Sequence, residues 1–174
     1  VLDAEIDVAK DMGVEIKTGI EVGKDVTIQQ LREQGYQAFY IAIGCSAGSL
    51  PDIKNINSQG VMTAIDYLHE SNCGNIPFDG KVVVVGGGNV AIDASRVSSR
   101  NKASQVQQFC LEQEVDMPAS NEEIAEARED GVTIHCGWGP QEIIETNGKV
   151  SAIVFKKCVS VFNDEGKFAP VYDE

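Results

Sequence analysis

The stretch that most constrains the fold is Val82–Gly88, a run of four valines followed at once by three glycines. A short apolar run bounded by glycine is typical of a strand that is buried on both faces of a parallel sheet. The residues after the glycines have the pattern of a helix. The stretch therefore predicts a strand that turns tightly into a helix, which is the first half of a βαβ unit.

The glycines have the spacing G-x-G-x-x-A, with Gly86, Gly88 and Ala91 at the marked positions. Gly86 allows the tight turn, Gly88 lets a pyrophosphate approach the backbone, and Ala91 lets the helix pack closely on its strand. The start of the helix offers free N–H groups and a partial positive charge to the phosphates. We therefore predict a pyrophosphate site made by Gly86, Gly87, Gly88, Asn89, Val90 and Ala91.

A second apolar run, Val106–Leu111, is a predicted strand that ends at Glu112. An acidic side chain at the tip of the second strand, about 20 residues after the glycines, is where a ribose hydroxyl is held in dinucleotide-binding folds. Taken alone, the glycines could be a tight turn with no ligand. The order of strand, glycine turn, helix, strand and acid favours dinucleotide binding.

A third strand is predicted over residues 132–136, and Trp138 follows it. Ligands bind beyond the carboxyl ends of parallel strands, so Trp138 is a candidate wall for the adenine or the nicotinamide; a hydrophobic lid on the core is the equal alternative. The next segments resemble an antiparallel meander, with strands over residues 150–155, 158–162 and 168–172. The predicted fold class is α/β, a Rossmann-like parallel βαβ sheet with an antiparallel β-meander.

The chain divides by pattern into three parts. Residues 1–44 contain two predicted helices, 2–12 and 28–34, and two predicted strands, 14–18 and 38–44, and they do not fit inside the βαβ unit. We read them as the last part of a preceding domain. Residues 45–80 are a connection with one helix that begins at Thr63, and residues 81–174 form the dinucleotide-binding domain.

Composition excludes several classes of function. The formal net charge of −13 argues against nucleic-acid or anionic-membrane partners, which require basic patches. The five cysteines form no C-x-x-C pair, so we expect neither a disulfide framework nor a metal site, and a cytoplasmic location. Arg96 and Arg100 are expected on an exposed helix face, and His135 inside a strand. No side chain is predicted to be catalytic, since neither histidine has a triad-like neighbourhood.

The sequence resembles the family of the glutamate synthase small (β) subunit, a family of flavoprotein oxidoreductases. The resemblance spans nearly the whole chain. The stretches that carry it are Leu2–Asp7, Glu21–Thr27, Ile41–Gly44, Val82–Asp93, Met117–Ser120 and Gly139–Ile143.

The resemblance implies a longer parent enzyme with FAD and a nicotinamide dinucleotide. Hydride passes from NAD(P)H to FAD, and electrons continue to iron–sulfur clusters or to a partner such as a glutamate synthase large subunit. Residues 1–44 then correspond to the trailing segment of the FAD-binding domain. The family's FAD glycine motif is not found in the chain, so we expect the chain alone to hold FAD weakly and to be inactive.

The chain departs from the family at Leu111 and Glu112, where many relatives have two arginines suited to an NADP 2′-phosphate. A carboxylate there favours NAD(H). Alanine at the third position of the glycine motif, here Ala91, is however often seen with NADP(H), so NADP(H) stays open as the cofactor. Two other functions also stay open. One is a non-catalytic nucleotide-binding or electron-transfer scaffold subunit. The other is an S-adenosylmethionine methyltransferase, against which the predicted meander argues.

Overall fold

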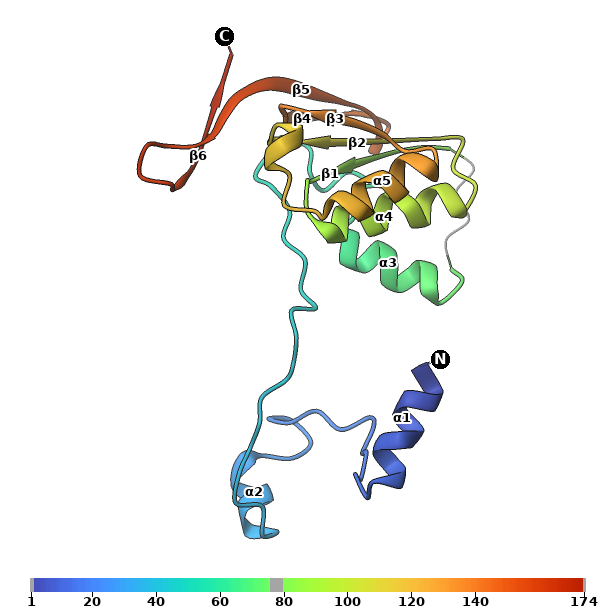
Figure 1. Cartoon of the computed structure of the whole chain (residues 1–174), viewed down its shortest axis with the longest axis vertical. Coiled ribbons are helices and arrows are strands. Elements are labelled where there is room, and N and C mark those ends of the chain that lie inside the picture. Colours follow the sequence, from blue (N-terminus) through green and yellow to red (C-terminus); the bar gives the residue numbers. More distant parts are fainter. Residues whose placement is uncertain (1, 76–79, 174) are drawn as a thin grey trace. The chain divides into compact units, whose positions relative to one another are not determined.

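The computed structural model describes residues 2–75 and 80–173 (Figure 1). The chain forms two compact units, Val1–Gly44 and Cys45–Glu174. Residues 45–75 thus belong to the same compact unit as the glycine-rich stretch. Within the described residues, no helix has the length and apolar character needed to cross a bilayer.

The first unit contains the two predicted helices. α1 (Leu2–Asp11) is followed by Gly13, whose φ of +89° suits glycine and ends the helix. α2 (Ile28–Glu33) begins with a capping box between Thr27 and Gln30. The Thr27 Oγ1 accepts from the Gln30 N–H at 3.2 Å, and the Gln30 Oε1 accepts from the Thr27 N–H at 2.8 Å. Local sequence signals alone specify both helices.

The two strands predicted in this unit do not form. Residues 14–18 and 38–44 belong to no sheet in the described chain. A strand needs a neighbour that pairs with its N–H and C=O groups, and the first unit offers none. Consequently the apolar side chains of Tyr40, Ile41 and Ile43 stay open to solvent, with Tyr40 94% and Ile43 86% exposed.

The second unit is built on a parallel sheet with the strand order β1-β2-β3. Its strands are β1 (Lys81–Val85), β2 (Gln105–Cys110) and β3 (Thr133–Cys136). Its helices are α3 (Ala64–Asn72), α4 (Asn89–Arg100) and α5 (Asn121–Glu129), and a short 3-10 turn (Glu114–Asp116) follows β2. The predicted βαβ unit is therefore present, with α4 and α5 as its crossover helices.

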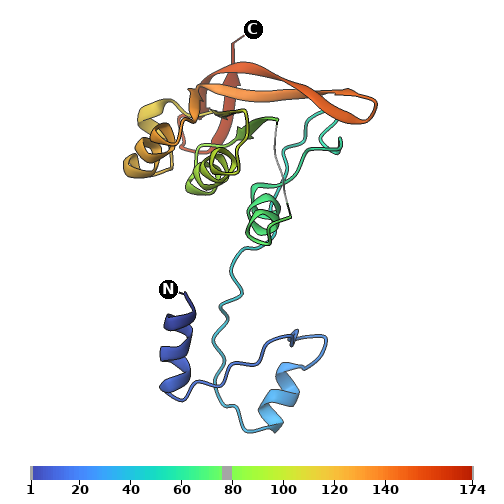
Figure 2. The same ribbon diagram turned by 90° about the vertical axis from the view of Figure 1, so that its right-hand side faces the viewer.

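Helices and an antiparallel sheet cover opposite faces of the parallel sheet (Figures 1 and 2). On the helical face, Val106 and Cys110 of β2 pack with Ile92 of α4 and with Ile124 and Ala127 of α5. These side chains are almost fully buried, so this cluster is the main apolar core of the unit.

The antiparallel sheet comprises β4 (Trp138–Thr146), β5 (Lys149–Phe162) and β6 (Phe168–Tyr172). A tight Asn147–Gly148 turn, with φ of 55° and 77°, joins β4 to β5 as its sequence predicts. The predicted fold class is confirmed, but the strand boundaries differ. Residues 149–162 form one strand because β4 pairs with the first part of the strand and β6 pairs with the second part. The pairing with β4 extends over Lys156 and Lys157, so the strand continues through this polar pair.

An aromatic stack joins the two sheets. The Phe109 ring of β2 lies between His135 of β3 and Phe155 of β5, with ring centroids 4.4 Å and 4.0 Å away. His135 is thus inside a strand, as expected. The stack fixes β5 over the face of the parallel sheet that the helices leave open.

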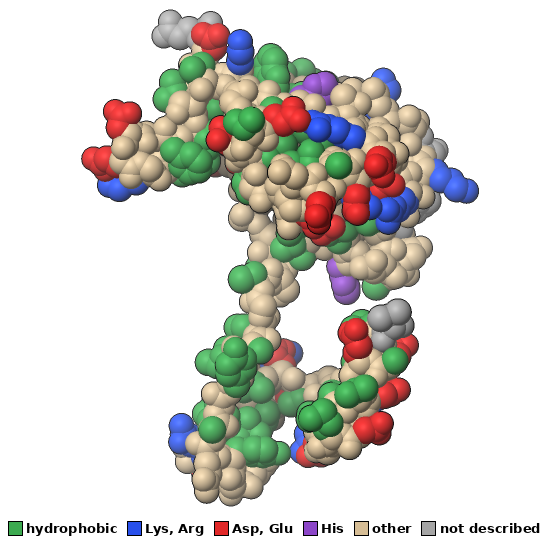
Figure 3. All heavy atoms as spheres, in the orientation of Figure 1, with side chains coloured by type: hydrophobic (Ala, Val, Ile, Leu, Met, Phe, Trp, Pro, Cys, Tyr) green, Lys and Arg blue, Asp and Glu red, His purple; other side chains and the backbone are tan. Residues whose placement is uncertain are grey.

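Ion pairs hold α4 against α5. Arg96 of α4 bonds to Glu126 and, through Nε at 2.8 Å, to the Asp130 Oδ2, which Arg100 also contacts at 3.0 Å. Charged side chains of both signs gather over these helices (Figure 3). The expectation of an exposed Arg96 is wrong. Its side chain is only 19% exposed because Glu126 and Asp130 enclose its guanidinium group.

Asp130→Asn should lower the melting temperature at neutral pH. The hydrogen bond from Arg96 lowers the pKa of the Asp130 carboxyl in the folded protein. The ionised carboxylate therefore stabilises the fold at pH values above its unfolded pKa of about 3.9, and this stabilisation is lost as the pH falls through the folded pKa. Circular dichroism melts from pH 7 to pH 3 should show the difference from wild type shrinking towards acid. Glu129→Gln, at the exposed last residue of α5 next to Asp130, is the matched control; a pH-independent difference for Asp130→Asn would contradict the assignment.

Candidate functional site

The glycine turn leaves β1 at Gly86, which has a φ of +141° that glycine adopts readily. The Gly86 N–H donates to the Phe109 carbonyl at 2.8 Å and so extends the pairing with β2 by one bond. A Cβ built on Gly86 lies 3.2 Å from the Ala91 Cβ, so a small side chain at Ala91 lets α4 approach the strand end. Gly86 and Ala91 therefore shape the turn.

Four consecutive backbone N–H groups beyond Gly86 lack an acceptor within the described residues: those of Gly87, Gly88, Asn89 and Val90. The first intrahelical bonds come from Ala91 and Ile92, which both donate to the Gly88 carbonyl. These groups lie at and just before the N-terminus of α4, which begins at Asn89 after the N-cap Gly88, and a helix N-terminus favours an anion. Gly86 is also expected from the sequence to contribute to the pyrophosphate site, but its N–H already donates to the Phe109 carbonyl in the sheet.

The segment between β2 and α5 is tied to this turn. The Ala119 N–H donates to the Gly87 carbonyl at 3.1 Å, and the Ser120 N–H donates to the Asn89 Oδ1 at 3.2 Å. Ser120 also caps α5, since its Oγ accepts from the Glu123 N–H at 3.2 Å. The spacing of Ser120 and Glu123 is typical of a helix cap, but no local pattern indicates that Ala119 and Ser120 support the glycine turn.

Glu112 lies directly above the turn. A Cβ built on Gly87 would come within 2.8 Å of the Glu112 Oε2 and 3.1 Å of the Cys110 Cβ. The Glu112 carbonyl accepts from the Gly137 N–H at 2.8 Å, which fixes the loop after β2 against the end of β3. The structure therefore brings the predicted acid and the predicted glycine turn together, and a side chain at position 87 would crowd Cys110 and Glu112.

A cavity of about 410 Å³ opens beside Glu112, between the end of β2 and β5. Glu112 and Asp116 give it two carboxylates, and none of its lining residues is Lys or Arg. Arg96, Arg100 and Arg128 are each paired with a carboxylate. The lining residues are Leu111, Glu112, Gln113, Asp116, Val159, Ser160, Val161 and Phe162. The cavity suits a neutral hydroxyl-bearing group better than a phosphate.

Trp138 does not line this cavity. It begins β4, pairs in register with Lys157 and is 37% exposed. Tyr172 covers the neighbouring position instead, because a Cβ built on Gly139 would meet the Tyr172 Cε1 at 2.5 Å. Burial raises the pKa of the Tyr172 hydroxyl. The sequence does not indicate this role of Tyr172, because Tyr172 lies 34 residues after Trp138 in the chain. It reaches Gly139, just beyond β3, only because it belongs to β6.

The cysteine beside the turn is not an activated nucleophile. Burial, reinforced by the neighbouring Cys136, raises the pKa of the Cys110 thiol to about 12, so the thiol keeps its proton at neutral pH. Within residues 2–75 and 80–173, no group of three His, Cys, Asp or Glu side chains could hold a metal ion. The arrangement can bind and orient a ligand.

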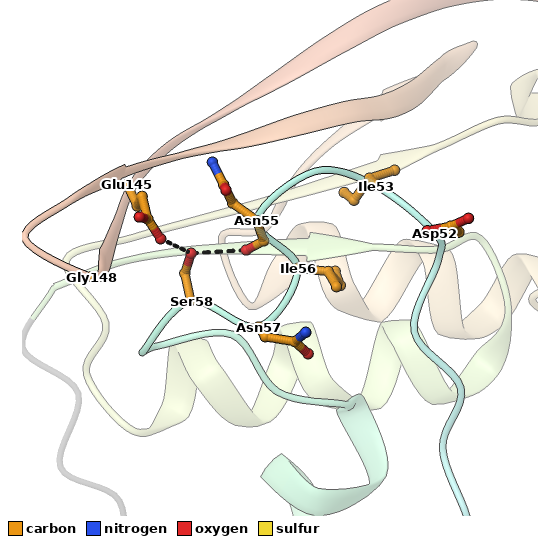
Figure 4. A pocket seen from close by; sticks show the side chains of 8 residues that line it. All are labelled: Asp52, Ile53, Asn55, Ile56, Asn57, Ser58, Glu145 and Gly148. Atoms are coloured by element: carbon orange, nitrogen blue, oxygen red, sulfur yellow. Dashed lines mark hydrogen bonds between the residues drawn. The ribbon is translucent and has the colours of Figure 1, made fainter.

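A larger cavity, of about 600 Å³, lies elsewhere, between the loop of residues 52–58 and the β4–β5 turn (Figure 4). Asp52 and Glu145 contribute carboxylates, and the Ser58 hydroxyl lies 2.8 Å from both the Glu145 Oε2 and the Asn55 carbonyl. No residue that lines it is positively charged. Two carboxylates disfavour a pyrophosphate in this larger cavity, and none of its lining residues belongs to the glycine turn.

Comparison with known proteins identifies the family of the chain. Residues 3–167 match the model of the pyridine nucleotide-disulphide oxidoreductase family. The match covers most of the chain, and the chain belongs to this family of oxidoreductases. The expected similarity to the glutamate synthase small subunit group is also confirmed.

The chain is similar to three curated subunits. It is 32% identical to the NADP(+)-dependent formate dehydrogenase subunit beta of Moorella thermoacetica, over 98% of the chain and 25% of that protein. It is 34% identical to the glutamate synthase [NADPH] small chain of Escherichia coli K12, over 82% of the chain and 33% of that protein. It is 36% identical to the NAD-dependent dihydropyrimidine dehydrogenase subunit PreT of Escherichia coli O157:H7, over 80% of the chain and 34% of that protein. The chain spans only about a quarter to a third of their lengths.

Among solved structures, the fold is similar to Mycobacterium tuberculosis FprA in complex with NADPH. The TM-score is 0.69, with 16% identity over 88% of the chain and 50% of FprA. At this identity the likeness establishes the fold alone.

Proposed function

We propose that this chain binds a nicotinamide dinucleotide at the glycine turn. The observation that carries the proposal is the row of four free N–H groups from Gly87 to Val90, beneath a carboxylate. These groups would hold the pyrophosphate, and Gly86 and Ala91 would shape the turn around it. The residues present fit the group, because unbonded N–H groups at a helix N-terminus favour an anion and Glu112 can accept from a ribose diol.

We further propose that NAD(H) is favoured over NADP(H). The names of the relatives include both NAD- and NADP-dependent proteins, so local charge must decide. Glu112 and Asp116 line the cavity beside the turn without a lysine or arginine. A 2′-phosphate there would face two carboxylates, whereas a 2′-hydroxyl could donate to one. Trp138 remains a candidate wall for the nicotinamide only if the bound ligand extends beyond this cavity.

The bound nicotinamide supplies hydride. The residues of this chain bind and orient it: the α4 N-terminus fixes the pyrophosphate, and Glu112 fixes the adenosine ribose. No side chain of the site is assigned a proton-transfer role, since hydride chemistry is carried by the cofactor.

The described residues offer no cradle for FAD. The helices of the first unit have no buried residue, and its apolar segment 38–44 is unpaired. We propose that residues 1–44 are a segment of an FAD-binding domain completed elsewhere in a longer protein. Its flavin would take hydride from the nicotinamide and pass electrons to iron–sulfur clusters or a partner subunit.

Calorimetry with NADH, NADPH and S-adenosylmethionine tests the ligand class. We expect heat of binding with NADH and none with S-adenosylmethionine. Gly88→Ser is the matching variant, because Gly88 has the extended backbone of a helix N-cap and its Cβ meets nothing within 4 Å. Serine caps helices well, so stability should be unchanged within about 0.5 kcal/mol.

The same serine side chain would occupy the space of the pyrophosphate. It would also accept a hydrogen bond from one of the free N–H groups at the start of α4, which would then be lost to the ligand. NADH binding should therefore weaken at least about tenfold, or 1.4 kcal/mol. Unchanged NADH affinity in a folded Gly88→Ser protein would contradict the proposed site.

Glu112→Arg should shift the preference towards NADPH. The guanidinium group would pair with a 2′-phosphate, and a charge-assisted hydrogen bond of about 1.5–3 kcal/mol corresponds to at least a tenfold change in the Kd ratio of NADPH to NADH. Glu129→Arg makes the same charge change at an exposed position on α5 and should leave the ratio unchanged. Equal ratios in the two variants would show that Glu112 does not decide the cofactor.

Anaerobic titration of the full-length flavoprotein with NADH tests the redox role. Bleaching of the flavin absorbance is the expected result. Flavin colour that persists with both NADH and NADPH would instead favour a non-catalytic scaffold subunit.

A further inference from the structure

A buried amide lies directly beneath the glycine turn. Gln108, in the middle of β2, is fully buried and shares the helical face of the sheet with Val106 and Cys110. A polar side chain in such a core is destabilising unless its hydrogen bonds are made. Both ends of this amide are bonded. The Gln108 Nε2 donates to the Gly86 carbonyl at 2.9 Å, and its Oε1 accepts from the Ser95 hydroxyl at 2.9 Å.

The orientation of the amide follows from its partners. The Gly86 carbonyl can only accept, so the group that faces it must be the amino group. Ser95 is also fully buried, and its Oγ lies 2.8 Å from the Ala91 carbonyl as well as 2.9 Å from Gln108. A bridge of buried polar groups thus runs from the turn, through β2, to the first turns of α4.

This bridge acts on the free N–H groups through peptide geometry. In a planar trans peptide, the C=O of one residue and the N–H of the next point in opposite directions. Drawing the Gly86 carbonyl towards Gln108 therefore turns the Gly87 N–H away from the core. The Ala119 N–H acts in the same way on the next peptide, because it holds the Gly87 carbonyl and so turns the Gly88 N–H outward.

We propose that Gln108 is a positioning residue for nucleotide binding, which fixes the Gly86–Gly87 peptide so that the turn presents its N–H groups before a ligand arrives. The inference rests on the proposed binding of a nicotinamide dinucleotide. Gln108 touches no ligand itself. Its contribution is preorganisation, since a turn with a free carbonyl would have to be ordered on binding.

Gln108→Met tests the proposal, because methionine has a similar length and no amide. Gln107→Met is the matched control, being the same substitution one residue earlier on β2, on the opposite face of the sheet and only partly buried. In the ligand-free full chain, the NMR amide signals of Gly87 and Gly88 should shift in Gln108→Met and stay in place in Gln107→Met. Calorimetry well below the melting temperature should show NADH bound about tenfold more weakly by Gln108→Met alone.

Ser95→Ala provides a second variant if Gln108→Met does not fold. It leaves the bond to Gly86 but removes the donor to Oε1, so a smaller shift of the same signals and a smaller loss of affinity are expected. A lower melting temperature with unchanged glycine signals and unchanged Kd would show that the bridge only stabilises the core, and would overturn the proposal. If wild type binds neither NADH nor NADPH, the proposed function fails, and the ligand-free signals alone decide whether Gln108 orients the turn.

Discussion

The hydrogen bond from the Gly86 N–H to the Phe109 carbonyl is the contact on which the site depends. It ends the pairing of β1 with β2 at the residue where the chain must turn into α4. Because the next four N–H groups then have no acceptor in the described chain, the sheet edge and the helix start together create a place for an anion. The same strand pairing places Glu112, two residues after β2, over Gly87.

Much of the second unit follows from its sequence. The valine run, the glycines and the capping residues Thr63 and Ser120 are local signals, and each element they predict is present. The site is predicted less completely. Gln108 and Ala119 support the turn through contacts between segments far apart in sequence, and a glutamine within a strand has no local feature that distinguishes it. Tyr172 reaches the strand ends only because β5 continues as one long strand into the hairpin with β6.

The first unit shows the limit of local signals. Its helices form from local signals, the Thr27 cap of α2 and Gly13 after α1, whereas segments 14–18 and 38–44 have strand-like sequences but no neighbour in the described chain to pair with. The segment that contains Tyr40 and Ile43 is as apolar as a buried strand, yet both side chains are exposed to solvent. The contrast supports the proposal that this unit belongs to a flavin domain completed elsewhere, whereas the residues of the proposed nucleotide site all lie in the second unit.

A crystal structure of the chain with NADH is the most direct test of the central claim. The account predicts pyrophosphate oxygens within hydrogen-bond distance, about 2.7–3.2 Å, of the N–H groups of Gly87 to Val90, with the adenosine ribose beside Glu112. A pyrophosphate bound elsewhere, for example in the cavity of residues 52–58, or a glycine turn whose Gly86 carbonyl swings away from Gln108 on binding, would contradict it.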